Sequence, residues 1–205
     1  MGVSAAWANA AKLSKNANII AVNRTAFDSI RILLSLVKRT HVTNPSRGGA
    51  LNLNLIRVAA PTSDAQMLIE ELEADLASAY DAEQRHGLSL ERIFQPNIAF
   101  FIAYSEGAPV GCGGIAFEDG YAELKRMYVR PSSRGRGVVQ ALIARLESEA
   151  AARGIKRVTL ETGDVQHAAI RAYERAGFTR CDAFGDYRSL SPSAIVRSVF
   201  FEKLI

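Results

Sequence analysis

Residues 122–143 combine, in order, an apolar extended run, a basic turn with two glycines and the start of a helix. The turn reads Arg134-Gly135-Arg136-Gly137, and Val138 begins the helix. The first backbone N–H groups of a helix have no partner within it, and the helix dipole adds positive potential there. Glycines let the main chain approach a phosphate, and arginines add charge. This order predicts a site for a phosphate-bearing ligand, although a solvated basic turn would produce the same short stretch.

Two common phosphate-binding motifs are absent from the sequence. A P-loop requires Gly, four residues and then Gly-Lys-Ser/Thr, and no such run occurs. The dinucleotide fingerprint Gly-x-Gly-x-x-Gly is also missing. Residues 111–114, Gly-Cys-Gly-Gly, come nearest, but they continue into another strand-like run and open no helix.

Two ordered motifs connect the chain with a known family. The run 123–137 resembles motif A of the GNAT superfamily of N-acetyltransferases, whose loop reads Gln/Arg-x-x-Gly-x-Gly/Ala. Arg134 and Gly137 match its first two specified places, and Val139 departs from the third. A second block, 169–178, resembles motif B at the expected distance. The resemblance covers roughly residues 51–205 and is closest to bacterial small-molecule acetyltransferases.

The resemblance implies acetyl-CoA as co-substrate and a set of residues that would hold it. The helix start would take the pyrophosphate of coenzyme A, and the main chain of one strand would pair with the pantetheine arm like an added strand. An amide at Gln166 falls where relatives carry Asn and could hold the same arm. Val139 is expected to shift or weaken the site without abolishing it, because backbone donors survive the change. The expected cofactor-binding residues are Met127, Tyr128, Val129, Arg134, Gly135, Arg136, Gly137, Val138, Val139 and Gln166.

Two residues are candidates for proton transfer. Glu123 lies 11 residues before Arg134, where some family members have a catalytic Glu, and a carboxylate on an apolar strand has a raised pKa that suits a general base. The alternative is a structural Glu123 paired with Lys125. Tyr173 matches the motif B tyrosine that in many relatives protonates the thiolate of coenzyme A. Its helical spacing equally allows a core tyrosine.

The acceptor side is specified less sharply. Polar residues follow the first helix, where the family builds its substrate wall, and others lie in a later variable loop. Their mixture of charges suits a small polar amine. The expected substrate-binding residues are Tyr80, Arg85, His86 and Tyr187. No Cys or Ser lies in a nucleophile setting, which favours direct transfer over an acyl-enzyme. Acetylation of protein N-termini or lysines, and an acyl-CoA sensor without turnover, remain the alternatives.

Charge divides the chain into two parts. Residues 1–50 contain seven Lys or Arg and a single acid, whereas residues 51–205 contain 18 Lys or Arg and 20 Asp or Glu. The larger part is thus near neutral, so no nucleic-acid partner is expected. Cys112 and Cys181 form no disulfide framework, and the three scattered histidines predict no metal site.

Residues 1–50 are interpreted as a basic extension that ends in the linker-like run 44–49, and residues 51–205 as the acetyltransferase domain. The apolar run 27–37 is too short to span a membrane. The expected location is cytoplasmic, with the mitochondrial matrix as the alternative if the extension is a transit peptide. Because family members are often dimers, the resemblance also leaves a homodimer open.

Local patterns predict the element order β-α-(α)-β-β-β-α-β-α-β-β. Strands are expected at 51–59, 99–104, 109–117, 121–129, 157–162 and 198–204, with a short return strand from Phe178. Ser63 with Gln66 has the spacing of a capping box for the first helix, and Asp164 is placed to cap a later one. The fold class expected is α/β with a mixed, mostly antiparallel sheet and helices on both faces, as in the GNAT fold.

Overall fold

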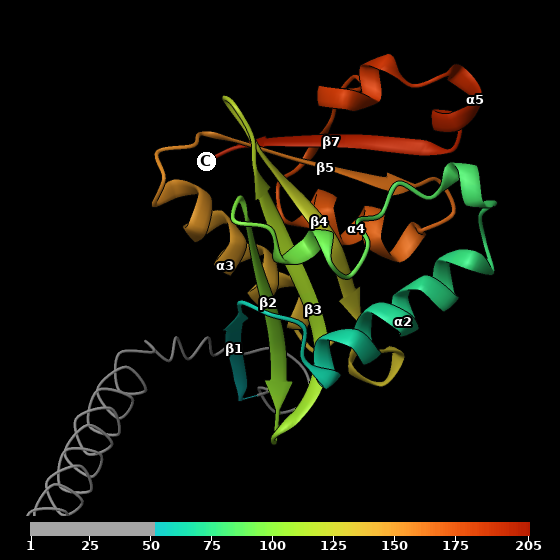
Figure 1. Ribbon diagram of the computed structural model, residues 1–205. Helices are drawn as coiled ribbons and strands as arrows, with labels where there is room; N and C mark the ends of the chain where they lie inside the picture. Colours follow the sequence, from blue (N-terminus) through green and yellow to red (C-terminus); the bar gives the residue numbers. More distant parts are fainter. Residues whose placement is uncertain (1–51) are drawn as a thin grey trace, which may run out of the picture. The chain divides into compact units, whose positions relative to one another are not determined.

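The computed structural model describes residues 52–205, so the interpretations of residues 1–50 lie outside the described part of the chain. Its strands are β1 Leu53–Val58, β2 Ile98–Ser105, β3 Ala108–Phe117, β4 Ala122–Val129, β5 Arg157–Gly163, β6 Thr179–Arg180 and β7 Ser198–Leu204. Its α-helices are α2 Ser63–Ala77, α3 Val138–Ala151, α4 His167–Arg175 and the short α5 Pro192–Ile195. Figure 1 shows this arrangement.

The strands form one seven-stranded sheet in the order β1-β2-β3-β4-β5-β7-β6. Only β4 and β5 run parallel, and the other neighbours are antiparallel. The predicted mixed, mostly antiparallel sheet is confirmed. The second helix that the sequence left in parentheses is replaced by two 3-10 turns, Ala82–Gln84 and Arg92–Phe94.

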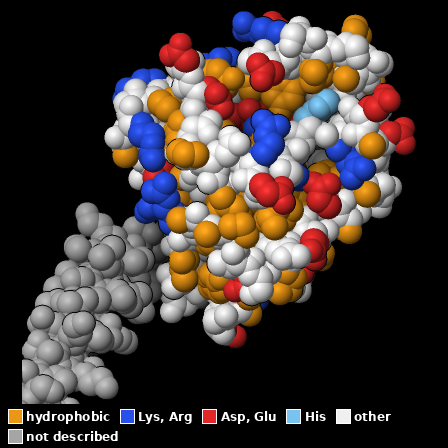
Figure 2. All heavy atoms as spheres, viewed as in Figure 1, with side chains coloured by type: hydrophobic (Ala, Val, Ile, Leu, Met, Phe, Trp, Pro, Cys, Tyr) orange, Lys and Arg blue, Asp and Glu red, His pale blue; other side chains and the backbone are white. Residues whose placement is uncertain are grey.

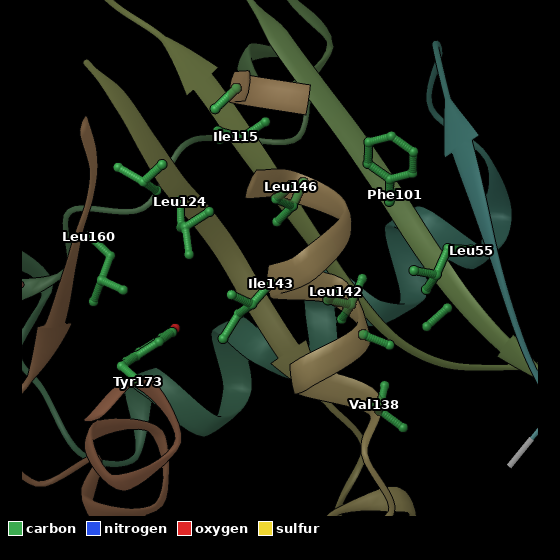
Figure 3. Packing of buried hydrophobic residues seen from close by; sticks show 14 of the residues in the cluster. Leu55, Phe101, Ile115, Leu124, Val138, Leu142, Ile143, Leu146, Leu160 and Tyr173 are labelled. Atoms are coloured by element: carbon green, nitrogen blue, oxygen red, sulfur yellow. The ribbon is translucent and has the colours of Figure 1, made fainter. Parts of the chain in front are cut away.

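Apolar side chains point alternately to the two faces of the sheet along the central strands, which explains why helices cover both faces. Phe101 packs with the apolar stripe of α3, whereas Phe100 and Ile102 pack with α2. Successive side chains of a strand point to opposite faces, so both layers bury apolar surface. In Figure 3, Val138, Leu142 and Leu146 of α3 lie over the strands that carry Phe101 and Ile115. Helix α3 stops before Gly154, which has a left-handed φ of 75°, while Ile155 N–H donates to the Ala150 carbonyl.

Two predicted helix caps were wrong. Thr62 caps α2, because its hydroxyl accepts from Ala65 N–H at 3.2 Å, and Ser63 is the first helical residue. Asp164 does not cap α4: its carboxylate pairs with Arg197 at 3.0 Å, and Gln166 stands at the cap position. Asp164 thus pairs with Arg197, which is distant in sequence, instead of capping the helix, and sequence spacing cannot reveal such a pair.

Strands β4 and β5 separate after a short paired stretch, and this separation positions the site. Their pairing is confined to Ala122–Leu124 against Val158–Leu160. Beyond it, β4 contains a bulge opposite Gly113, where Arg126 adopts a left-handed φ of 56°. Bulges bend a strand and re-aim its side chains. The main chain of the second half of β4 is thus left without β5 as a partner.

None of the helices within residues 52–205 combines the length and apolar character that a membrane crossing requires. On the face shown in Figure 2, acidic and basic side chains are interspersed with hydrophobic ones and form no single basic patch.

Candidate active site

The turn that precedes α3 lies beside the end of β4 that has no pairing with β5, and both line one cavity. Gly135 and Gly137 both have left-handed φ values, 74° and 86°. Gly137 is the N-cap of α3 and offers no side chain to the helix. The first intrahelical bond runs from Ala141 N–H to the Gly137 carbonyl, so the preceding N–H groups have no partner within the helix. Uncapped donors at the positive end of a helix dipole fit a phosphate.

The arginines of this turn lie in different environments. Arg134 lines the cavity beside the turn, donates from Nε to the Val129 carbonyl at 3.0 Å and pairs with Asp75 at 3.1 Å. These contacts hold the turn against β4 and α2. Arg136 is exposed and lies outside the cavity lining. Val139 is half-buried, packs against the core and also lines the cavity.

A large cavity extends from this turn along β4. Its volume is about 470 Å³. The strand residues Met127, Tyr128 and Val129 form one wall, and Gln166 with Tyr173 forms part of the other. A long ligand with an anionic end and an extended arm therefore fits between the helix start and the unpaired edge of β4.

A smaller cavity of about 130 Å³ adjoins the first. The two share six lining residues: Leu72, Leu76, Met127, Gln166, Ala169 and Tyr173. One ligand in each cavity would thus meet at this junction, which is the arrangement that direct group transfer requires.

Tyr173 lies at the junction and is also a core residue. Its side chain is 6% exposed and packs edge-to-face on Phe178, with ring centroids 6.0 Å apart. Figure 3 shows it projecting from α4 toward the strands. Burial raises the pKa of the phenol well above its ordinary value. A phenol of this kind stays protonated at neutral pH and can donate a proton.

Glu123 is buried and paired, as in the alternative that its sequence allowed. One carboxylate oxygen lies 2.6 Å from Lys125 Nζ and accepts from the Tyr187 hydroxyl at 2.9 Å. Lys125 Nζ also donates to Tyr187 at 2.9 Å, which closes a three-membered group. Burial raises the pKa of Glu123, while Lys125 and Tyr187 act in the opposite direction.

All four residues expected on the acceptor side line the smaller cavity. The Tyr80 hydroxyl accepts from Val165 N–H at 3.0 Å, and Arg85 pairs with Glu73 at 3.3 Å. His86 Nε2 lies 3.1 Å from the Ala194 carbonyl, and its ring stands edge-on to Tyr187. Loop residues from both ends of the domain thus form one wall.

Comparison with known proteins agrees with this geometry. The family model described as "Acetyltransferase (GNAT) family" matches residues 66–178. A protein of Azospirillum brasilense named "IAA acetyltransferase" is 42% identical over 147 residues, which cover 70% of this chain and 93% of that protein. The chain belongs to the GNAT acetyltransferase family.

Solved structures place the fold in the same family. A putative acyl-CoA N-acyltransferase from Klebsiella pneumoniae superposes with a TM-score of 0.60 at 32% identity, covering 74% of this chain and 97% of that one. The paiA N-acetyltransferase of Thermoplasma acidophilum, solved in complex with coenzyme A, has a TM-score of 0.57 at 19% identity and covers 74% and 99%. The expectations of a GNAT fold and of an acyltransferase enzyme are therefore confirmed.

Sequence reasoning missed two charged residues of this acetyltransferase that line the smaller cavity, Arg126 and Glu161, and it named Lys125 only as a partner of Glu123. A glutamate within the strand-like run 157–162 was a signal for Glu161, because a charge in an apolar strand requires a reason. No local signal marks Arg126, whose position depends on the bulge of β4. Within residues 52–205, no group of three or more His, Cys, Asp or Glu is arranged to hold a metal ion.

Proposed function

We propose that this protein transfers the acetyl group of acetyl-CoA to a primary amine of a small polar molecule, directly and without an acyl-enzyme. The observation that carries the proposal is the pair of adjoining cavities, one ending at the uncapped start of α3 and the other lined by polar side chains. Their shared lining at Tyr173 brings donor and acceptor together. Membership of the GNAT family supports acetyl transfer in general.

In this proposal the residues of the large cavity bind coenzyme A. The α3 N–H groups from Val138 onward, with Gly135 and Gly137, would hold the pyrophosphate, and Arg134 would brace the turn. The main chain of Met127–Val129 would pair with the pantetheine arm. Acetyl-CoA supplies the acyl group as a reactive thioester when it is bound. Tyr173 would donate a proton to the departing sulfur.

The acceptor would occupy the smaller cavity. Its limited volume, about 130 Å³, favours a small amine over a protein chain. Two carboxylates line it, the buried Glu123 and the half-buried Glu161. The assignment of Glu123 as general base stays a prediction, since the observed pairing commits its charge to Lys125.

Turnover tests the proposal directly. Acetyl-CoA would be incubated with a panel of small amines, and release of free thiol followed over time. Amine-dependent thiol release is expected. Tight coenzyme A binding without thiol release for any amine would instead favour an acyl-CoA sensor.

The basic extension is proposed to be dispensable for this chemistry. A protein that lacks residues 1–50 is expected to fold and to bind coenzyme A within about threefold of full-length affinity, because the sheet and both cavities lie within residues 52–205. Calorimetry on both forms measures this. Aggregation or a large loss of affinity in the shorter form would show that the domain boundary at residue 51 is wrong. The cytoplasmic location and the homodimer stay predictions.

A further inference from the structure

The smaller cavity contains one carboxylate whose charge no cation balances by direct contact among the described residues. Glu161 of β5 accepts a single hydrogen bond, from the Ser198 hydroxyl at 2.7 Å. Glu123, in the same cavity, is neutralised by Lys125 at 2.6 Å. The titratable groups that act on Glu161 or are influenced by it are Tyr80, His86, Glu123, Lys125, Tyr173 and Tyr187. A cationic group of the acceptor would therefore be attracted to Glu161.

The opposite charge is in excess at another part of the same lining. Arg85 and Arg126 share a single carboxylate, that of Glu73. Arg126 directs its remaining donors to the Leu88 carbonyl, with Nε at 2.5 Å. Arg85 Nε is buried and finds no acceptor within residues 52–205. Buried guanidinium donors are normally paired, so Arg85 has the donor and the charge to receive an anionic group.

We propose that the acceptor is a small amino acid or a similar zwitterion, whose ammonium binds Glu161 and whose carboxylate binds Arg85. This inference rests on the proposed function. One negative charge without a paired cation and one excess positive charge on the lining of a cavity of about 130 Å³ match a short molecule with both charges. A simple amine would leave Arg85 without its anion, and a simple carboxylate would leave Glu161 without its cation.

Glu161 is in this scheme also the group that frees the amine for reaction. It takes one proton from the ammonium and passes it to water, which leaves a neutral amine with a lone pair. That pair forms the C–N bond to the thioester carbonyl carbon, and the C–S bond breaks. The nitrogen then gives a second proton to Glu161, which releases it to water. The sulfur gains one proton from Tyr173, whose phenolate is reprotonated from water, so the products are the amide, the free thiol and one proton released to solvent.

The charge on Glu161 is expected to lower the free energy of unfolding in a pH-dependent way. Burial raises the pKa of its carboxyl above the unfolded-state value. The ionised form therefore destabilises the fold at a pH above the raised pKa, and this penalty disappears as the pH falls below the unfolded-state pKa. Glu161→Gln keeps an acceptor for Ser198 and removes the charge. It is expected to raise the Tm by a few degrees at pH 8 and to leave it unchanged near pH 4.

The activity of the same variant distinguishes a role of Glu161 in the reaction from a purely structural role. Glu161→Gln is expected to reduce kcat/KM by about 10²-fold, the scale of a lost general base, with an unchanged Kd for coenzyme A. Glu202→Gln, on the neighbouring strand β7 and outside both cavities, serves as the control and is expected to retain activity. A merely structural glutamate would lose stability and keep its activity when replaced, and that result would overturn the role of Glu161.

Matched acceptors test the zwitterion. Each amino acid of a small panel would be compared with its amide and its decarboxylated amine. The free carboxylate is expected to raise kcat/KM at least about tenfold, as expected for a charge-assisted contact. In Arg85→Gln, the ratio of kcat/KM for the amino acid to kcat/KM for its amide or amine should fall to about two or less. Arg153→Gln, just beyond the C-terminal end of α3, should leave this ratio unchanged. Equal rates for all three forms, or no turnover of the panel by a protein that binds coenzyme A, would overturn this inference and leave the cofactor site standing. Failure to bind coenzyme A would instead refute the proposed function.

Discussion

Replacing Gly137 with Asp is expected to weaken coenzyme A binding by well over tenfold. The new carboxylate would stand at the uncapped start of α3, where the pyrophosphate is proposed to lie. It would repel the phosphates and take up the positive potential of the helix start. Calorimetry with coenzyme A, after circular dichroism has shown an intact fold, measures the change.

Gly137→Asn is the matched control for this prediction. Asn has the same size as Asp and tolerates the left-handed φ of 86° about as well, but it carries no charge. The difference in affinity between the two variants therefore isolates the electrostatic contribution. Asp and Asn variants with equal affinities would show that charge at this turn is irrelevant, and a folded Asp variant with unchanged affinity would remove the site from the turn.

Tyr173→Phe is expected to lower kcat by about 10²-fold, the typical loss for a general acid. The ring would keep its packing on Phe178 and Phe201, so the Tm should change little. The affinity for coenzyme A should also be retained, since only the hydroxyl is removed. Steady-state kinetics together with thermal denaturation measures both effects.

The control for this loss is a half-buried tyrosine outside the site. Tyr121→Phe removes a hydroxyl next to Gly185, outside both cavities, and should leave kcat unchanged. A kcat that holds in Tyr173→Phe while the Tm falls would show that Tyr173 is only a core residue. A large kcat loss in both variants would point to a general effect of removing phenols from this domain.

The two predictions and the inference about the acceptor concern three parts of one site. Gly137 lines the large cavity where the phosphates are proposed to lie, Tyr173 lines both cavities, and Glu161 lines the smaller cavity that is proposed for the acceptor. Variants at these positions should therefore change different quantities: Kd for coenzyme A, kcat, and kcat/KM for the acceptor, respectively.

Local sequence patterns were sufficient for most of the elements and for the glycine turn before α3. The stripe Val138, Leu142, Leu146 and Ala150 predicts α3 because its spacing matches the helical period, and Gly137 before it predicts the turn. These features depend on neighbours a few residues apart. The family resemblance added the motif places of Arg134 and Tyr173, which local patterns alone leave undecided.

The pairing of charges in the smaller cavity was determined only by tertiary structure. Glu123 and Tyr187 are 64 positions apart, yet their hydrogen bond and the pair with Lys125 decide where the charge of Glu123 goes. Glu161 became the unbalanced carboxylate because β4 and β5 separate after three paired residues and open the cavity. Sequence spacing reports contacts within one strand or helix, but the balance of buried charges depends on which distant side chains share a cavity. For this protein, the sequence therefore determined the fold and the glycine turn before α3, and the packing of distant segments decided which carboxylate of the smaller cavity has no cation in direct contact.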